Sequence, residues 1–154
     1  LDRFETFVAE NEPTGLEEIY TRTFDVCAPC CMDVGYQLFG ENYTRGAFLV
    51  RMKQETRAHG VDPGSELPDH LPVVLRLLGS LNDEEDPAGL VREAMLPAMD
   101  KMVASLRGGD GPYRSLLDGI ADWLAAAYSV DRASVVLPIE PRAHLPVLGQ
   151  GAVP

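Results

Sequence analysis

Apolar side chains recur at the spacing of α-helices along most of the chain, and this pattern constrains the fold more than any other feature. The clearest stripe follows Pro112 and consists of Tyr113, Leu116, Leu117, Ile120, Leu124 and Tyr128. Residues at this spacing share one face of an amphipathic helix. No segment shows the convincing apolar–polar alternation of a half-buried strand. The sequence therefore predicts an all-α fold, a single-domain helical bundle of about six or seven helices.

Local signals suggest how individual helices begin and bend. Thr14 and Glu17 have the spacing of a capping box, in which Thr14 caps a helix and Glu17 reaches back to it. That helix carries Tyr20 and Phe24 on its apolar stripe, so we expect both side chains in the core. Pro97 falls within a later helical pattern, from about residue 87 to residue 107, and should bend it.

Composition excludes several classes of partner. The 154 residues carry a formal net charge of −11, with 45% hydrophobic and 24% charged residues, as in a soluble globular domain. Nucleic acids and anionic membrane surfaces select basic proteins, so neither is expected as a partner. The acidity favours a cationic partner, although solubility alone also explains it. No apolar run approaches the length of a membrane span.

The two ends of the chain suggest different structures. Leu1 is not an initiator methionine and the first residues already read as a helix, so we expect an N-terminal piece to have been removed. Residues 1–128 form the expected helical domain. From residue 129 the helical pattern fails and prolines recur, which predicts an extended C-terminal arm over residues 129–154.

The segment Glu66-Leu-Pro-Asp-His-Leu-Pro72 concentrates shape and charge in seven residues. Because proline fixes φ and favours extended geometry in the residue before it, we expect Leu67 and Leu71 to be extended. Pro72 suits the first position of the helix that follows. A stiff loop carrying Glu66, Asp69 and His70 would form a recognition surface. The alternative is a solvated loop that merely leads into a helix.

A cluster of three cysteines, Cys27, Cys30 and Cys31, offers a different chemistry. A C-x-x-C pair can form a redox dithiol or half of a zinc site. Pro29 at a helix start would place Cys30 and Cys31 in the first turn, where the helix dipole lowers a thiol pKa. Packing as small buried hydrophobes is the alternative. A thiol-based redox or zinc-binding regulator using these cysteines therefore remains an alternative function.

Three segments in order resemble one known family. Glu66–Pro72, preceded by Tyr36-Gln-Leu-Phe-Gly-Glu41 and Arg45-Gly-Ala-Phe-Leu49, is similar to the nitrate reductase delta-subunit (NarJ) family, within the TorD-like redox enzyme maturation group. The similarity runs from about Leu16 to about Leu81. It implies a cytoplasmic assembly chaperone, monomeric or homodimeric, with no cofactor of its own. Catalytic signatures such as phosphate loops or nucleophile elbows are missing from the sequence, so no enzyme is expected.

The resemblance also implies a partner and a site. The partner is the catalytic subunit of a molybdenum oxidoreductase, captured by its arginine-bearing N-terminal peptide until the bis-molybdopterin guanine dinucleotide cofactor is inserted. Such a peptide needs an apolar groove edged by carboxylates. The expected groove walls are Tyr36, Phe39, Leu67 and Leu71. The expected edge carboxylates are Glu41, Glu66 and Asp69. Residues expected to orient or stiffen the loop are His70, Pro68 and Pro72.

Overall fold

The computed structural model describes residues 2–25, 30–106 and 111–135. Within these ranges the chain is largely helical and contains no β-strand, which confirms the all-α prediction. The helices are α1 (Asp2–Glu10), α2 (Pro13–Phe24), α3 (Val34–Phe39), α4 (Tyr43–Ala58), α5 (Leu71–Leu78), α6 (Pro87–Leu90), α7 (Leu96–Ser105) and α8 (Pro112–Ala127). Short 3-10 turns lie at Asp83–Glu85 and Arg132–Ser134, and a π-helical turn at Val91–Met95.

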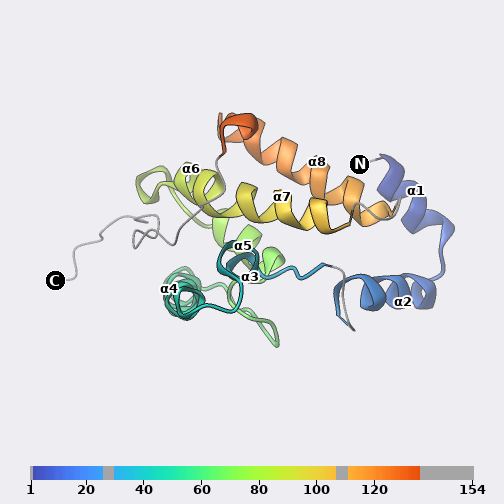
Figure 1. Cartoon of the computed structure of the whole chain (residues 1–154), viewed down its shortest axis with the longest axis horizontal. Coiled ribbons are helices and arrows are strands. Elements are labelled where there is room, and N and C mark those ends of the chain that lie inside the picture. The colour runs from blue at the N-terminus through green and yellow to red at the C-terminus, as the bar shows by residue number, and fades with distance from the viewer. Residues whose placement is uncertain (1, 26–29, 107–110, 136–154) are drawn as a thin grey trace.

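Helix α7 forms the centre of the packing, between α8 on one side and α3 on the other (Figure 1). Helix α4 packs on α3, at the end of the molecule opposite α1 and α2. Leucine and methionine supply most of the largest side chains in the core, and methionine fills irregular gaps between the short helices. The largest fully buried members of the core include Met52, Leu77, Leu90, Met95, Leu96, Met99, Met102 and Leu124.

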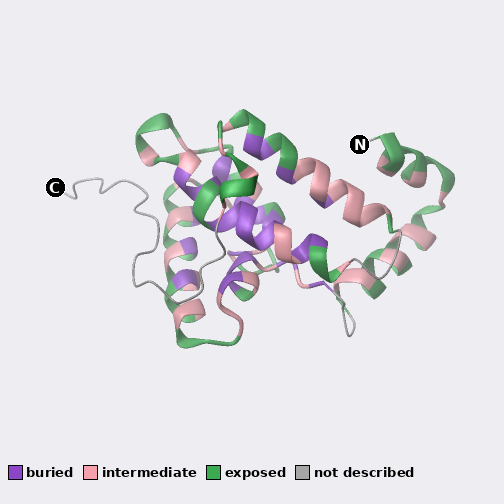
Figure 2. Cartoon of the chain, turned by 45° about the horizontal axis from the view of Figure 1, so that its top comes forward, coloured by how far each residue is buried: buried purple, intermediate pink, exposed green. Residues whose placement is uncertain are grey.

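Helices α1 and α2 have no buried residue and lie at the periphery, where Figure 2 shows no purple ribbon. They are held to α8 through aromatic rings around Tyr113. The rings of Phe24 and Tyr113 are 4.9 Å apart, and those of Phe4 and Tyr113 are 5.7 Å apart. Tyr20 is 42% exposed, so the expectation that it lies in the core is wrong.

Two predictions about single helical turns, the cap at Thr14 and the bend at Pro97, can be compared with the structure. Helix α2 begins at Pro13 with Glu12 as N-cap, so Thr14 lies inside the helix and the predicted capping box is wrong. Proline at the first turn is preorganised for helix and fixes the earlier start. Pro97 follows directly on the π-helical turn Val91–Met95. The sequence predicted a bend at Pro97, and the structure has the wider π-helical turn just before it. This turn makes room for the proline ring and for the hydrogen bond that proline cannot donate.

The chain beyond α8 lies against the bundle as far as residue 135. The Arg132 guanidinium lies 2.6 Å from Asp100 Oδ1 and 2.8 Å from Asp118 Oδ1, and it also contacts Asp122. Val130 and Val135 pack against the core. The first residues of the predicted arm therefore dock on the bundle, and for residues 136–154, which lie outside the described ranges, the arm stays a prediction. No helix in those ranges has both the length and the apolarity that crossing a membrane requires.

Arg132 should contribute measurably to stability, because its removal leaves three aspartates facing one another. We expect Arg132→Gln to lower the free energy of unfolding by about 1 kcal/mol, less at high salt since the carboxylates are partly exposed. Urea unfolding measures this value. Arg92→Gln is the control, because among the described residues Arg92 pairs with exposed Glu93 alone. Equal effects of the two substitutions would contradict the assignment.

Candidate functional site

The segment singled out in the sequence joins the N-termini of two helices. The backbone N–H of Val34 donates to Asp69 O, and the N–H of Leu71 donates to Met32 O, each at 2.9 Å. These bonds form an isolated antiparallel bridge between Asp33 and His70, the N-cap residues of α3 and α5. The loop of residues 66–70 is therefore fixed against the start of α3 by backbone contacts.

Asp69 caps α3 from this neighbouring segment. Its Oδ2 accepts a hydrogen bond from the Gly35 N–H at 3.0 Å, and the residue is fully buried. A carboxylate at a helix N-terminus is favoured by the unpaired amides there and by the helix dipole. The approach requires glycine, because a Cβ on residue 35 would lie 2.7 Å from that Oδ2 and 2.7 Å from Phe48 Cδ1. Asp69 was expected at the edge of a groove, and the structure corrects this to an interior position.

A second carboxylate, Asp33, links both helices to α4. His70 Nδ1 donates to Asp33 Oδ1 at 3.3 Å, and Arg45 donates to Asp33 Oδ2 at 3.0 Å. The hydrogen bond from His70 lowers the pKa of Asp33 despite burial, and the Arg45 charge adds to this. The Arg45 guanidinium also lies 5.3 Å from the centre of the Tyr36 ring. The sequence predicted that His70 orients the loop through a hydrogen bond. The structure shows such a hydrogen bond, and its acceptor, Asp33, was not among the predicted residues.

The remaining predicted residues divide between surface and interior. Leu71 is 2% exposed and the first residue of α5, so it is neither extended nor a groove wall. Pro72 is accordingly the second helical residue. Phe39 is half-buried and packs on Phe48, with ring centres 5.6 Å apart. Pro68 is also half-buried.

Five predicted residues lie on the surface: Tyr36, Glu41, Glu66, Leu67 and Pro72. Tyr36 is 38% and Leu67 45% exposed, which leaves apolar area open to a partner. Glu66 lies near α2, since its charge is the second cause, after burial, of the raised pKa of Tyr20. The accessible part of the candidate site is therefore two carboxylates, the side chains of Tyr36 and Leu67, and Pro72 at the start of α5.

The described cysteines do not have the environment of reactive thiols. Cys30 is buried, and neither Cys30 nor Cys31 lies in a helix, since α3 begins at Val34. Burial raises the pKa of both thiols, opposite to the lowering expected from a helix start. Cys27 lies outside the described residues. Within those residues no group of three potential ligands is placed to hold a metal ion.

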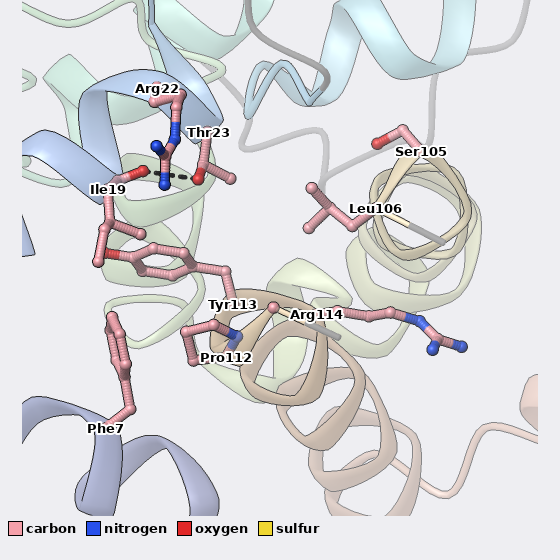
Figure 3. A pocket seen from close by; sticks show the side chains of 10 residues that line it. Phe7, Ile19, Arg22, Thr23, Ser105, Leu106, Pro112, Tyr113 and Arg114 are labelled. Atoms are coloured by element: carbon pink, nitrogen blue, oxygen red, sulfur yellow. Dashed lines mark hydrogen bonds between the residues drawn. The ribbon is translucent and has the colours of Figure 1, made fainter. Parts of the chain in front are cut away.

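Sequence reasoning did not find a cavity of about 400 Å³ between α2, the end of α7 and the start of α8 (Figure 3). Its lining includes Phe7, Ile19, Leu106 and Tyr113. The helical spacing of the aromatic residues in α1 and α2 was a visible signal. This spacing did not reveal that the rings pack on Tyr113, in the first turn of α8, and not in the core.

Gly35 should not tolerate a side chain. We expect Gly35→Ala to lower the free energy of unfolding by about 1–3 kcal/mol, because the added methyl displaces both Asp69 and Phe48. Urea unfolding measures this, with Gly46→Ala as the matched control. Gly46 is also helical but has open space at its Cβ, so alanine there should stabilise by about 0.5–1 kcal/mol. Equal signs for the two variants would contradict the packing described.

Asp69 should make stability fall as the pH rises through a defined window. Burial, with the nearby charge of Asp33, raises the pKa of Asp69 in the folded protein, whereas the unfolded chain ionises at about 3.9. The folded state therefore binds the extra proton, and stability declines from about pH 3.9 up to the raised pKa. Asp33, with its lowered pKa, acts below that window.

Replacing Asp69 with Asn should remove this decline. We expect the unfolding free energy of Asp69→Asn, relative to the unsubstituted protein, to increase with pH above about 3.9. Urea titrations at several pH values measure the difference, and exposed Asp83→Asn serves as the control. A pH-independent difference for Asp69→Asn would show that the carboxylate is not held in the environment described.

Comparison with known proteins places this arrangement in a family. No solved structure matches the chain. It is 26% identical over 136 residues to the nitrate reductase molybdenum cofactor assembly chaperone NarJ of Escherichia coli (strain K12), covering 88% of this chain and 57% of the relative. It is 34% identical over 115 residues to the probable NarJ chaperone of Bacillus subtilis (strain 168), covering 74% of this chain and 61% of the relative.

The chain thus spans about three fifths of the length of these curated relatives. The model of the nitrate reductase delta subunit family matches residues 1–106, which include α1 to α7 and the junction of α3 with α5. This match confirms the resemblance drawn from the three sequence segments. The chain belongs to the nitrate reductase delta subunit family.

Proposed function

We propose that this protein is a cytoplasmic assembly chaperone for a molybdenum oxidoreductase. It binds the arginine-bearing N-terminal peptide of the catalytic subunit and holds the apoenzyme until its molybdenum cofactor has been inserted. The observation that carries the proposal is the family match, together with relatives named as molybdenum cofactor assembly chaperones of nitrate reductase. The role requires binding surfaces and no catalytic residues.

The accessible side chains near the α3–α5 junction have the chemistry that such a peptide needs. Tyr36 and Leu67 supply exposed apolar area, and Glu66 supplies an exposed carboxylate on the same loop as Leu67. Arginine pairs well with carboxylates and stacks on aromatic rings. The contact of Arg45 with Asp33 and the Tyr36 ring is an internal example of this chemistry. Glu41, also exposed, is a further candidate carboxylate.

The buried members of the motif have a different role in this proposal. Asp69, Leu71 and His70 hold the loop in one shape, so that its exposed residues are presented without a large ordering cost on binding. The net charge of −11 adds a long-range attraction for a cationic peptide, and this attraction should weaken with salt.

Charge reversal at Glu66 tests the proposal. We expect Glu66→Lys to weaken binding of the catalytic subunit's N-terminal peptide by about 5-fold or more, because an exposed attraction becomes a repulsion. Calorimetric titration measures the affinity, and the fold should be unchanged because the side chain is exposed. Glu84→Lys is the matched control, since Glu84 is an exposed acid on the turn before α6.

Two results would contradict the proposal in different ways. Failure of every candidate N-terminal peptide to bind the folded protein would remove peptide capture. Equal weakening by Glu66→Lys and Glu84→Lys would leave peptide capture in place. It would show that Glu66 acts through its contribution to the net charge of the protein and not through a direct contact with the peptide.

A further inference from the structure

His59 is the C-cap residue of α4, and both nitrogens of its ring face hydrogen-bond acceptors. Nδ1 lies 3.0 Å from the backbone oxygen of Glu55, one turn earlier in the same helix. Nε2 lies 2.7 Å from Oε1 of Glu85, in the 3-10 turn between α5 and α6. A carbonyl oxygen and an ionised carboxylate accept hydrogen bonds and cannot donate them. Each therefore needs a proton on the ring nitrogen that it faces.

A neutral imidazole carries one ring proton, so it can donate only one of these two hydrogen bonds. With the proton on Nδ1, the lone pair of Nε2 would face the Glu85 carboxylate. With the proton on Nε2, the lone pair of Nδ1 would face the Glu55 carbonyl. The imidazolium carries both protons and donates both bonds. The contacts of His59 thus fit the charged ring and neither neutral tautomer.

The surroundings of His59 also favour the charged ring. It stands at the carbonyl end of α4, where the helix dipole stabilises a cation. The charged side chains that influence it most are two carboxylates, Glu55 on its own helix and Glu85 on the neighbouring turn. The hydrogen bond to the Glu55 backbone, followed by the contact with Glu85, raises the pKa of His59 above its ordinary value. These contacts outweigh the burial of the ring, which acts in the opposite direction.

Glu85 also holds its own turn together. Its Oε2 accepts a hydrogen bond from the Asn82 N–H at 2.9 Å, and the Asn82 side chain accepts one from the Glu84 N–H at 3.0 Å. The Asn82 N–H, and after it His59, lowers the pKa of Glu85, so this carboxylate stays ionised in the range where His59 titrates. One carboxylate therefore connects the end of α4 to the fold of the turn before α6.

We propose that His59 and Glu85 form a pH-sensitive latch between the end of α4 and the turn before α6. The latch is closed while the ring carries both protons, and loss of one proton opens one of its two contacts. The loop that begins at Gly60 and leads to the candidate site is tied at this end by the latch. Its other end is fixed by the backbone bridge between Asp33 and His70, whose amides do not titrate in this range. A rise in pH therefore releases one end of the loop and leaves the other in place.

The latch does not depend on the proposed chaperone function, and its test needs no client. Nitrogen-15 NMR of the histidine rings in the full chain measures the titration midpoint of His59, whose signal His59→Gln identifies. We expect this midpoint to lie higher in the folded protein than in the urea-unfolded chain. Glu85→Gln should lower it, because the charge that faces Nε2 is removed. Glu84→Gln is the matched control and should leave it unchanged, since Glu84 is an exposed acid on the same turn.

Urea unfolding of His59→Gln, Glu85→Gln and the double variant measures the coupling between the two residues at each pH. We expect the coupling to favour the folded state by about 2- to 5-fold in the unfolding equilibrium constant at about pH 6. Because the pKa of His59 is raised on folding, this contribution is fully present below about pH 6.5. It should decline as the pH rises through the raised pKa, where the folded state loses the proton that the latch requires.

Three results would overturn the inference. They are a His59 midpoint no higher in the folded than in the unfolded chain, equal effects of Glu85→Gln and Glu84→Gln on that midpoint, and a coupling of the same size on both sides of it. The NMR comparison remains decisive if His59→Gln fails to fold. The chain has three histidines, so His70→Gln and His144→Gln then identify the His59 signal by elimination.

Discussion

The hydrogen bond from the Gly35 amide to the buried carboxylate of Asp69 is the contact on which the candidate site depends. It places a charged group inside the protein, at the one end of α3 where unpaired amides favour it. The backbone bridge between Asp33 and His70 then fixes the starts of α3 and α5 side by side. Neither short helix would be stable alone, because helices of 6 and 8 residues are marginal in water. Their shared start gives the loop before α5 a defined shape.

This arrangement separates two tasks within one short motif. The buried residues set the shape of the loop, and the exposed ones, Glu66 and Leu67, remain free to contact a partner. A single substitution in the motif can therefore reduce binding by unfolding the loop or by removing a contact. Stability and affinity measured on the same variants distinguish these effects. The cavity near Tyr113 is lined by residues of other helices, so it is a separate feature of the same small bundle.

Helical periodicity was sufficient to predict the all-α fold and the stripe along α8, because burial of one face dictates the spacing. Residues whose state depends on distant neighbours were not predictable in the same way. Asp69 reads as a surface acid until Gly35, 34 positions earlier, supplies the amide that allows its burial. The sequence near Asp33 did not indicate its role, because that role depends on His70 and Arg45, two later residues that both donate to its carboxylate. Thr14 failed as a cap because Pro13 started the helix earlier.

We propose that a loop held rigid by buried contacts presents the residues that capture the client peptide. Hydrogen–deuterium exchange of the full chain, with and without the N-terminal peptide of the catalytic subunit, is the decisive measurement. We expect the amides of residues 64–67 to gain protection on binding. The amides that form the bridge, Val34 and Leu71, should already be protected without peptide. Protection confined to α4 or to the cavity lining would show that the peptide binds elsewhere.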